Sequence, residues 1–440
     1  MSTDHPPKTR PPATPGTGHG RISTETVRTI VEARHTRRTF WKQLALIGPA
    51  FVAGAWQFGP GNLTTAMNAG ALYGYALIWV IIISTILMIF LTDMSVRLGI
   101  RTPVSLISSI KERLGGWVGV VAGVGVFLIT LCFSVGNAVG SGVGLSMLIP
   151  GTSPVMWTVI CTVAVGAILL LKGIYGVVEK ILIVIVALMA FCFIASAFAA
   201  NPDWAAAGAG LIPVVPEGAW LLIIGLVGTN FSINAAFYTS YGTKARKRTE
   251  ADYRDITMVD TVPGIVAPGI MTALVIIVAA AVLNATGTDA PGAFGGLTKI
   301  FEPIAGPVGA WIFALGFFGA AFSSMIPNCV AGGTMLSDAL GRGPSADTAT
   351  ARLGSAFILA FGITITIVFS GSSPVQLIII AQALTVLFAP VLAALIVIMA
   401  NDKKLMGPLR NRWWQNLLGV VGLLSVLLLS GRLVVSLISG

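Results

Sequence analysis

Residues 43–72 read QLALIGPAFVAGAWQFGPGNLTTAMNAGAL and contain no charged side chain. The stretch is long enough for a transmembrane helix, which needs about 20 mainly apolar residues. Its centre, Gly59-Pro60-Gly61-Asn62, opposes a continuous helix, because proline lacks an N–H donor and glycine permits unwinding. Lipid cannot satisfy the backbone groups that such a break frees, so the break must be buried in protein or line a cavity. The stretch therefore predicts a broken membrane helix inside a bundle.

A second stretch, residues 219–243, has a similarly irregular centre. This centre begins at Gly228 and carries amide or hydroxyl side chains at Asn230, Ser232 and Asn234. The two broken helices are the first and sixth of the expected spans. They are five spans apart along the chain, and because five is odd, they cross the membrane in opposite directions. Two interrupted helices at matching positions of two five-helix halves are typical of inverted-repeat transporters, whose substrate site lies between the breaks.

Charge-free stretches recur along the whole chain of 440 residues. Apolar residues make up 55% of it and charged residues 10%, whereas a soluble domain has roughly 25% charged residues. Uninterrupted apolar runs exclude an outer-membrane barrel, whose strands alternate polar and apolar residues. The sequence predicts an all-α polytopic membrane protein with eleven helices, over residues 43–72, 75–96, 117–147, 155–171, 181–200, 219–243, 261–283, 308–338, 353–370, 374–400 and 413–431.

This division defines the expected domains. Residues 1–42 are rich in Pro, Thr and Arg and lack the apolar segment of a signal peptide, so we expect a disordered cytoplasmic tail. Residues 43–200 hold helices one to five, the first repeat. Residues 219–400 hold helices six to ten, the inverted repeat. Residues 413–440 hold the eleventh helix and the C-terminus.

The net charge of +10 raises the question of nucleic-acid binding, which the location of the basic residues excludes. If the N-terminus is cytoplasmic, all 27 Lys and Arg residues except Lys299 and Arg432 fall in cytoplasmic segments. This is the positive-inside rule. The basic residues set the topology and face anionic lipid head groups. We therefore expect a protein of a bacterial cell membrane, with the N-terminus in the cytoplasm and the C-terminus outside.

Short motifs are distributed over nearly the whole chain after residue 43. They are Gly48-Pro49-Ala50-Phe51, Gly59-Pro60-Gly61-Asn62-Leu63-Thr64-Thr65, Asn68-Ala69-Gly70, Tyr73-Gly74-Tyr75, Arg97-Leu98-Gly99-Ile100, Tyr175-Gly176-Val177, Asp260 and Ser323-Ser324. Together they resemble the motifs of the NRAMP metal transporters. The resemblance implies a LeuT-type inverted repeat of five plus five helices with an eleventh helix, and transport of a divalent metal cation by alternating access.

At the positions of the family's metal ligands the chain departs from that pattern. Gly59 stands where the first-helix motif has Asp, and Ser232-Ile233-Asn234 stands where the sixth-helix motif has Met-Pro-His. Asn62 is the one side-chain metal ligand of the family type that is retained. The resemblance therefore implies a metal site without the family's carboxylate and thioether.

The positions that handle protons in the family also differ. Its acidic pair on the third helix, which serves proton passage, falls on Ser134 and Asn137. As a separate departure, its glutamine on the eighth helix falls on Phe322. A proton-coupled carrier needs titratable groups inside the membrane, so we expect transport that is not driven by protons. The acids within or at the edges of the expected spans, all near cytoplasmic ends, are Asp93, Asp260 and Asp338.

We expect the substrate site between the two breaks. Its expected members are Gly59, Asn62, Asn230, Ser232 and Asn234. The helix-break backbone is expected at Pro60, Gly61 and Gly228. A polar path to the site would use Ser134, Asn137, Ser323 and Ser324.

The chemistry of these groups leaves several functions open. Amide, hydroxyl and carbonyl oxygens suit a hard or partly hydrated cation such as Mg²⁺ better than Mn²⁺ or Fe²⁺, which take carboxylate, imidazole or sulfur ligands. They suit a small organic solute such as an amino acid equally well. A non-transporting membrane sensor is a further alternative. An enzyme is not expected, because no histidine follows His35 and no acid pair lies at depth. The expected partners are a small ion or small molecule and the lipid bilayer, with no cofactor.

Overall fold

The computed structural model describes residues 46–170, 175–284, 298–301 and 306–438. The tail expected over residues 1–42 lies outside them. Regular structure in the described ranges is helical, and these ranges contain no strand.

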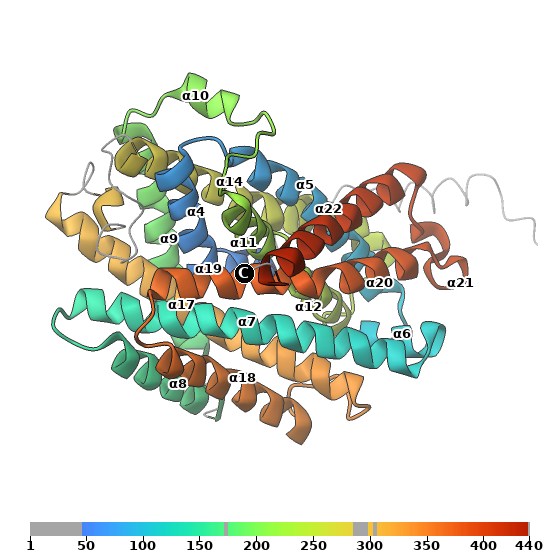
Figure 1. Ribbon diagram of the computed structural model, residues 1–440. Coiled ribbons are helices and arrows are strands. Elements are labelled where there is room, and N and C mark those ends of the chain that lie inside the picture. Colours follow the sequence, from blue (N-terminus) through green and yellow to red (C-terminus); the bar gives the residue numbers. More distant parts are fainter. Residues whose placement is uncertain (1–45, 171–174, 285–297, 302–305, 439–440) are drawn as a thin grey trace, which may run out of the picture. The chain divides into compact units, whose positions relative to one another are not determined.

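The first half of the bundle begins with a broken helix. Its first piece ends at Gln57 and its second piece begins at Pro60. The interruption therefore falls at Phe58 and Gly59, where the sequence predicts it. Continuous helices follow the broken one (Figure 1). The elements are α3 (Pro49–Gln57), α4 (Pro60–Tyr73), α5 (Ile78–Arg101), α7 (Gly116–Leu148), α8 (Pro154–Leu170) and α9 (Tyr175–Ala199).

The second half repeats this order with a second broken helix. Its seventh span is composite, because two π-helical turns flank the α-helix α14. The tenth span bends. The elements are α11 (Trp220–Asn230), α12 (Ile233–Ala245), η1 (Glu250–Asp252), α13 (Tyr253–Ile256), η2 (Thr257–Thr261), α14 (Val262–Ala279), η3 (Ala280–Asn284), α17 (Pro307–Ala339), α18 (Ala349–Val368), α19 (Pro374–Leu384), η5 (Thr385–Leu387) and α20 (Ala389–Asn401).

One long helix, α22 (Trp413–Ile438), follows the two halves. It packs against α20 and α5, and Figure 1 shows it crossing the front of the bundle. Short helices occupy the connections. They are α6 (Leu106–Leu114), α10 (Trp204–Ala209), η4 (Thr298–Phe301), α21 (Lys403–Met406) and η6 (Gly407–Leu409).

Within the described ranges, seven helices are long and apolar enough to cross a membrane. An eighth span follows if Pro374–Leu387 and Ala389–Asn401, which bend by 41°, count as one. The other expected spans correspond to the shorter apolar helices Pro154–Leu170 and Val184–Ala199 and to the broken pair α3–α4. The count differs from eleven because the first span is divided between α3 and α4, and Pro154–Leu170 and Val184–Ala199 are shorter than the other spans.

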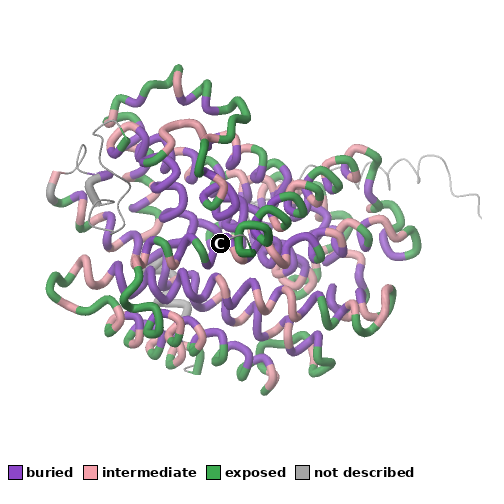
Figure 2. Tube along the Cα trace, in the orientation of Figure 1, coloured by how far each residue is buried: buried purple, intermediate pink, exposed green. Residues whose placement is uncertain are grey.

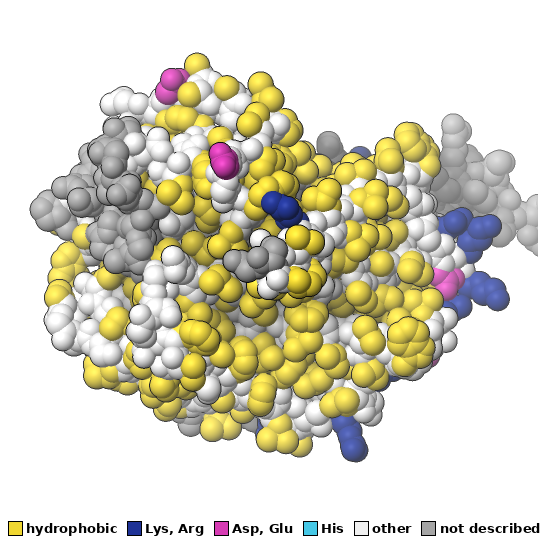
Figure 3. All heavy atoms as spheres, in the orientation of Figure 1, with side chains coloured by type: hydrophobic (Ala, Val, Ile, Leu, Met, Phe, Trp, Pro, Cys, Tyr) yellow, Lys and Arg dark blue, Asp and Glu magenta, His cyan; other side chains and the backbone are white. Residues whose placement is uncertain are grey.

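The broken helices lie in the interior and the other helices surround them. Figure 2 shows α4 and α11 mostly buried, whereas buried and exposed residues alternate along α18 and most of α22. The exposed faces are apolar, as at Ile86 (45% exposed), Phe191 (65%) and Leu428 (63%). Apolar side chains cover the visible surface, while Lys and Arg gather mainly at the end where α21 lies (Figure 3). A bilayer solvates such a surface, and water does not.

Close backbone approach positions the first half-helix. A methyl group built on Gly54 of α3 would lie 1.7 Å from the carbonyl oxygen of Gly264 on α14. No side chain fits there, so glycine lets α3 lie directly against the seventh span. Small residues at helix contacts are the usual means of close packing in membranes.

Candidate functional site at the two helix breaks

The first break lies at Phe58 and Gly59. Gly59 is extended (φ −91°, ψ −177°), Pro60 begins α4, and no side chain caps the new helix. The first backbone N–H groups of α4 and the last carbonyls of α3 therefore have no helical partners at this point. Proline in the first turn is well tolerated because its missing N–H is not needed there.

Three elements meet at Gly59. A methyl group on Gly59 would lie 3.4 Å from Oγ of Ser324, 3.4 Å from the carbonyl oxygen of Trp56 and 3.7 Å from Oδ1 of Asn137. The expected polar-path residues Asn137 and Ser324 are thus brought together with the expected site residue Gly59. Gly59 therefore faces polar groups of α7 and α17.

The second break lies at Phe231 and Ser232. Ser232 precedes α12 without capping it, and its Oγ donates to Oδ1 of Asn234 at 2.8 Å. Both side chains are buried. In the first break, Oδ1 of Asn62 accepts a hydrogen bond from Oγ1 of Thr272 on α14 at 2.7 Å. Each break therefore holds one amide side chain whose oxygen is engaged by a neighbouring hydroxyl.

Buried amide groups on the broken helices and their neighbours keep atoms without a hydrogen-bond partner among the described residues. Such a group costs about 1–3 kcal/mol when nothing satisfies it, so its presence in a native structure requires an explanation. A bound solute is one. The atoms are Nδ2 of Asn62, Asn137 and Asn234, Oδ1 of Asn328, Oε1 of Gln382, and both amide atoms of Gln57.

Gln57 and Gln382 were not among the site residues expected from the sequence. Gln382 on α19 occupies space that two glycines leave: a methyl group on Gly61 would lie 2.3 Å from its Cδ, and one on Gly136 would lie 2.7 Å from its Nε2. The side chain of Gln382 therefore sits against both α4 and α7. The signal in the sequence was a glutamine in the middle of an apolar span, which is a polar group placed at a cost in the membrane.

Two expected residues serve other contacts. Asn230 donates from Nδ2 to Ser84 Oγ at 2.7 Å and to Thr85 Oγ1 at 2.8 Å, which fastens α11 to α5. Gly228, expected in the helix-break backbone, lies inside α11, and the break falls at Phe231 and Ser232 instead. A methyl group on Gly228 would lie 2.3 Å from the carbonyl oxygen of Gln382. This glycine therefore permits close helix packing.

The remaining polar-path residues do not reach the breaks with their hydroxyls. Ser134 donates to the carbonyl of Leu131 at 2.7 Å, and Ser323 donates to that of Ala320 at 3.2 Å. Both bonds lie within the residue's own helix. Of the four residues expected on the path, only Asn137 and Ser324 border Gly59.

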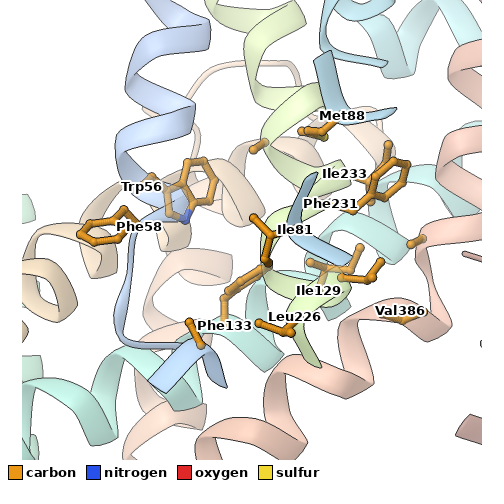
Figure 4. Packing of buried hydrophobic residues seen from close by; sticks show 14 of the residues in the cluster. Trp56, Phe58, Ile81, Met88, Ile129, Phe133, Leu226, Phe231, Ile233 and Val386 are labelled. Carbon is orange, nitrogen blue, oxygen red and sulfur yellow. The ribbon is translucent and has the colours of Figure 1, made fainter. Parts of the chain in front are cut away.

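Aromatic and aliphatic side chains enclose the polar groups. Figure 4 shows Trp56 and Phe58 beside the first break, with Phe231 and Ile233 at the second. Trp56 packs edge-to-face on Tyr238 with ring centroids 5.5 Å apart, and Phe58 packs on Phe193 at 6.4 Å. This apolar packing separates the amides from water, which strengthens any electrostatic interaction there.

The three acids near span ends are buried and used structurally. Asp93 forms an ion pair with Arg97, with the carboxylate oxygen 2.9 Å from Nε. Every one of the three carboxylates is engaged by protein donors. The donors are Arg97 and Tyr253 for Asp93, the hydroxyls of Ser105, Ser108 and Tyr241 for Asp338, and the backbone N–H groups of Gly48, Ala50 and Phe51 for Asp260.

Comparison with known proteins identifies the family. A sequence model described as natural resistance-associated macrophage protein-like (Nramp) matches residues 50–436. The divalent metal cation transporter MntH of Caldanaerobacter subterraneus subsp. tengcongensis is 26% identical over 404 residues, covering 89% of this chain and 93% of the relative. MntH of Klebsiella pneumoniae (strain 342) is 25% identical over 424 residues, covering 93% and 98%. These relatives are transporters and not enzymes.

Solved structures confirm the predicted fold. The manganese transporter of Eremococcus coleocola, in complex with an aromatic bis-isothiourea substituted compound, matches with a TM-score of 0.75 at 18% identity, covering 90% of this chain and 87% of that chain. MhsT in complex with L-phenylalanine matches with a TM-score of 0.57 at 16% identity, covering 87% and 98%. Both matches support the all-α LeuT-type architecture. The chain is an integral membrane protein and, as its motifs predict, a member of the Nramp family.

Proposed function

We propose that this protein is a secondary transporter that moves a divalent metal cation by alternating access, with the ion held between the two helix breaks. The observation that carries the proposal is the group of unmatched, buried amides at and beside both breaks. Relatives that cover most of the chain are named divalent metal cation transporters. Membership in the same family supports the same class of cargo.

The donor set favours a hard cation. No group of three or more His, Cys, Asp or Glu residues that could hold a metal occurs in the part of the chain that the structure describes. The breaks offer amide and hydroxyl oxygens and the free carbonyls at the ends of α3 and α11, where the helix dipole is negative. Such oxygen ligands suit Mg²⁺ that keeps some of its water, while Mn²⁺ and Fe²⁺ gain more from nitrogen and sulfur.

An amino acid or a similar solute is the second candidate, and one observation favours it. The unmatched atoms of Asn62, Asn137 and Asn234 are all amide nitrogens, which are donors and cannot bind a cation. A carboxylate group would accept from them, and the N-termini of α4 and α12 would stabilise its negative charge. A rotated amide would present oxygen in place of nitrogen, which keeps the cation as the first candidate.

The orientation and the driving force belong to the same proposal. The distribution of Lys and Arg supports a cytoplasmic N-terminus and an external C-terminus in a bacterial cell membrane. The engagement of Asp93, Asp260 and Asp338 by structural donors supports transport without protons. The cargo would then move down its own gradient or with another ion.

The test is uptake by proteoliposomes that contain the full chain. Mg²⁺, Ca²⁺, Mn²⁺ and radiolabelled amino acids are offered in separate assays. We expect uptake of Mg²⁺ that Asn62→Ala and Asn234→Leu each abolish, because both remove an amide at a break. Asn68→Ala is the matched control: Asn68 lies farther along α4, and its Nδ2 donates to the carbonyl of Thr64 at 2.8 Å.

The outcomes separate the candidates. Amino-acid uptake without metal uptake would favour the second candidate. Full transport by both break variants would refute this location for the site. Transport that Asn68→Ala abolishes equally would mean that the variants act through folding.

A further inference from the structure

A cavity of about 200 Å³ lies between α5, α11 and α22 and extends to Phe231 at the second break. Apolar cavities of about 150 Å³ stay dry and bind small apolar molecules. The outer faces of its wall are exposed, as at Ile83 (39%) and Leu428 (63%), so the cavity adjoins the surface that meets the bilayer. Its wall is almost wholly apolar and includes Trp79, Ile83, Leu87, Trp220, Phe231 and Leu428.

A basic residue stands beside this cavity. The guanidinium carbon of Arg432 lies 5.2 Å from the ring centroid of Trp220, which lines the wall. Arg432 follows the wall residues Leu428 and Leu429 by about one helical turn. No ion pair joins it to a carboxylate within the described ranges. An apolar cavity is therefore combined with an unneutralised positive charge at its side.

We propose that this cavity and Arg432 bind an anionic phospholipid, with one acyl chain in the cavity and the phosphate beside the guanidinium group. Guanidinium is suited to phosphate because its N–H groups match the phosphate oxygens. An acyl chain that moves from the bilayer into the cavity gains no hydrophobic free energy, since both environments are apolar. The gain comes from filling a void whose lining otherwise lacks van der Waals contacts.

The position of the cavity connects its occupant to the second helix break. Phe231, which ends α11 at the break, forms part of the wall. Ser84 also lines the cavity, and its Oγ accepts the hydrogen bond from Asn230. An acyl chain in the cavity packs against both the break residue and the group that fastens α11 to α5.

Native mass spectrometry of the full chain, released from nanodiscs of equal phosphatidylglycerol and phosphatidylcholine, tests the proposal. We expect the released protein to retain phosphatidylglycerol in preference to phosphatidylcholine. Ser425→Phe fills the cavity from its α22 wall and should remove the retained lipid. Leu424→Phe is the matched control, because Leu424 is 59% exposed and is not one of the residues that line the cavity. Arg432→Gln should abolish the preference for phosphatidylglycerol, and Arg412→Gln at the other end of α22 should leave it.

A second variant that fills the cavity keeps the test decisive if Ser425→Phe does not fold. A methyl group on Gly422 would make ordinary contacts of 3.6 Å with the Phe231 ring and 3.7 Å with Leu87, so Gly422→Leu extends into the same space. Lipid retention that survives both filling variants would overturn the cavity as the binding site. Equal retention of the two lipids by the unmodified protein would overturn the role of Arg432. Neither measurement depends on which solute is transported.

Discussion

The carboxylate of Asp260 accepts a hydrogen bond from the backbone nitrogen of Gly48 at 2.8 Å, although 212 residues separate the two. It also accepts from the nitrogens of Ala50 (3.2 Å) and Phe51 (2.8 Å). The half-helix α3 has no capping side chain of its own. A buried carboxylate from the seventh span supplies the cap, which joins α3 to that span.

Asp260→Asn should loosen α3. The amide keeps the shape but loses the charge, and hydrogen bonds to a charged group are worth about 1.5–3 kcal/mol. We expect a lower unfolding temperature and faster maleimide labelling of a cysteine introduced as Gly59→Cys. Asp347→Asn is the control, because Asp347 is 87% exposed and pairs only with Arg352 at the surface. Equal labelling in both backgrounds would contradict the capping role.

Gly59→Asp combined with Ser232→Met should raise the affinity for Mn²⁺. The backbone of Gly59 is one that any residue adopts, and the contacts of an added Cβ are no shorter than 3.4 Å. The pair restores a carboxylate and a thioether at the breaks. Calorimetric titration measures the change, with Gly59→Asn plus Ser232→Met as the uncharged control. Tight Mn²⁺ binding by the unmodified protein would refute the argument from ligand chemistry.

Gly61→Ala should weaken substrate binding by displacing Gln382. The added methyl group would lie 2.3 Å from Cδ of Gln382, so the side chain must move away from α4. Gln382→Ala should weaken binding to a similar degree. The double variant should be no worse than either single one, since contacting residues are not additive. Gly166→Ala, where nothing lies within 4 Å, is the neutral control. Additive losses would show that the two positions act separately.

Uptake should not acidify the vesicle lumen. Asn137 and Ser134 stand where the resemblance to the family implies an acidic pair, and neither side chain titrates near neutral pH. A pH-sensitive dye trapped in proteoliposomes reports proton entry, and a protonophore added at the end shows that the dye responds. Acidification that requires substrate and scales with uptake would mean that a titratable group takes part in transport.

Much of the architecture was readable from the sequence. The charge-free stretches locate the spans, because an apolar run of sufficient length is a local property of the chain. Gly59-Pro60-Gly61 predicts the first break, since proline and glycine act on their own backbone. The second break lies beside Ser232 and Asn234 as expected, but at Phe231 and Ser232 and not at Gly228, the glycine that the sequence offered for it.

Only the tertiary structure decided which polar groups meet. Asn230 looks like a site residue in the sequence, yet its amide is used by Ser84 and Thr85 on α5. Gln382 is a lone polar group in an apolar stretch of the sequence, and only the packing shows that it lies against Gly61 of α4. The physical reason is that a buried polar group takes its partner from whichever helix packs beside it. Those partners come from distant parts of the chain, and the local pattern of residues does not contain them.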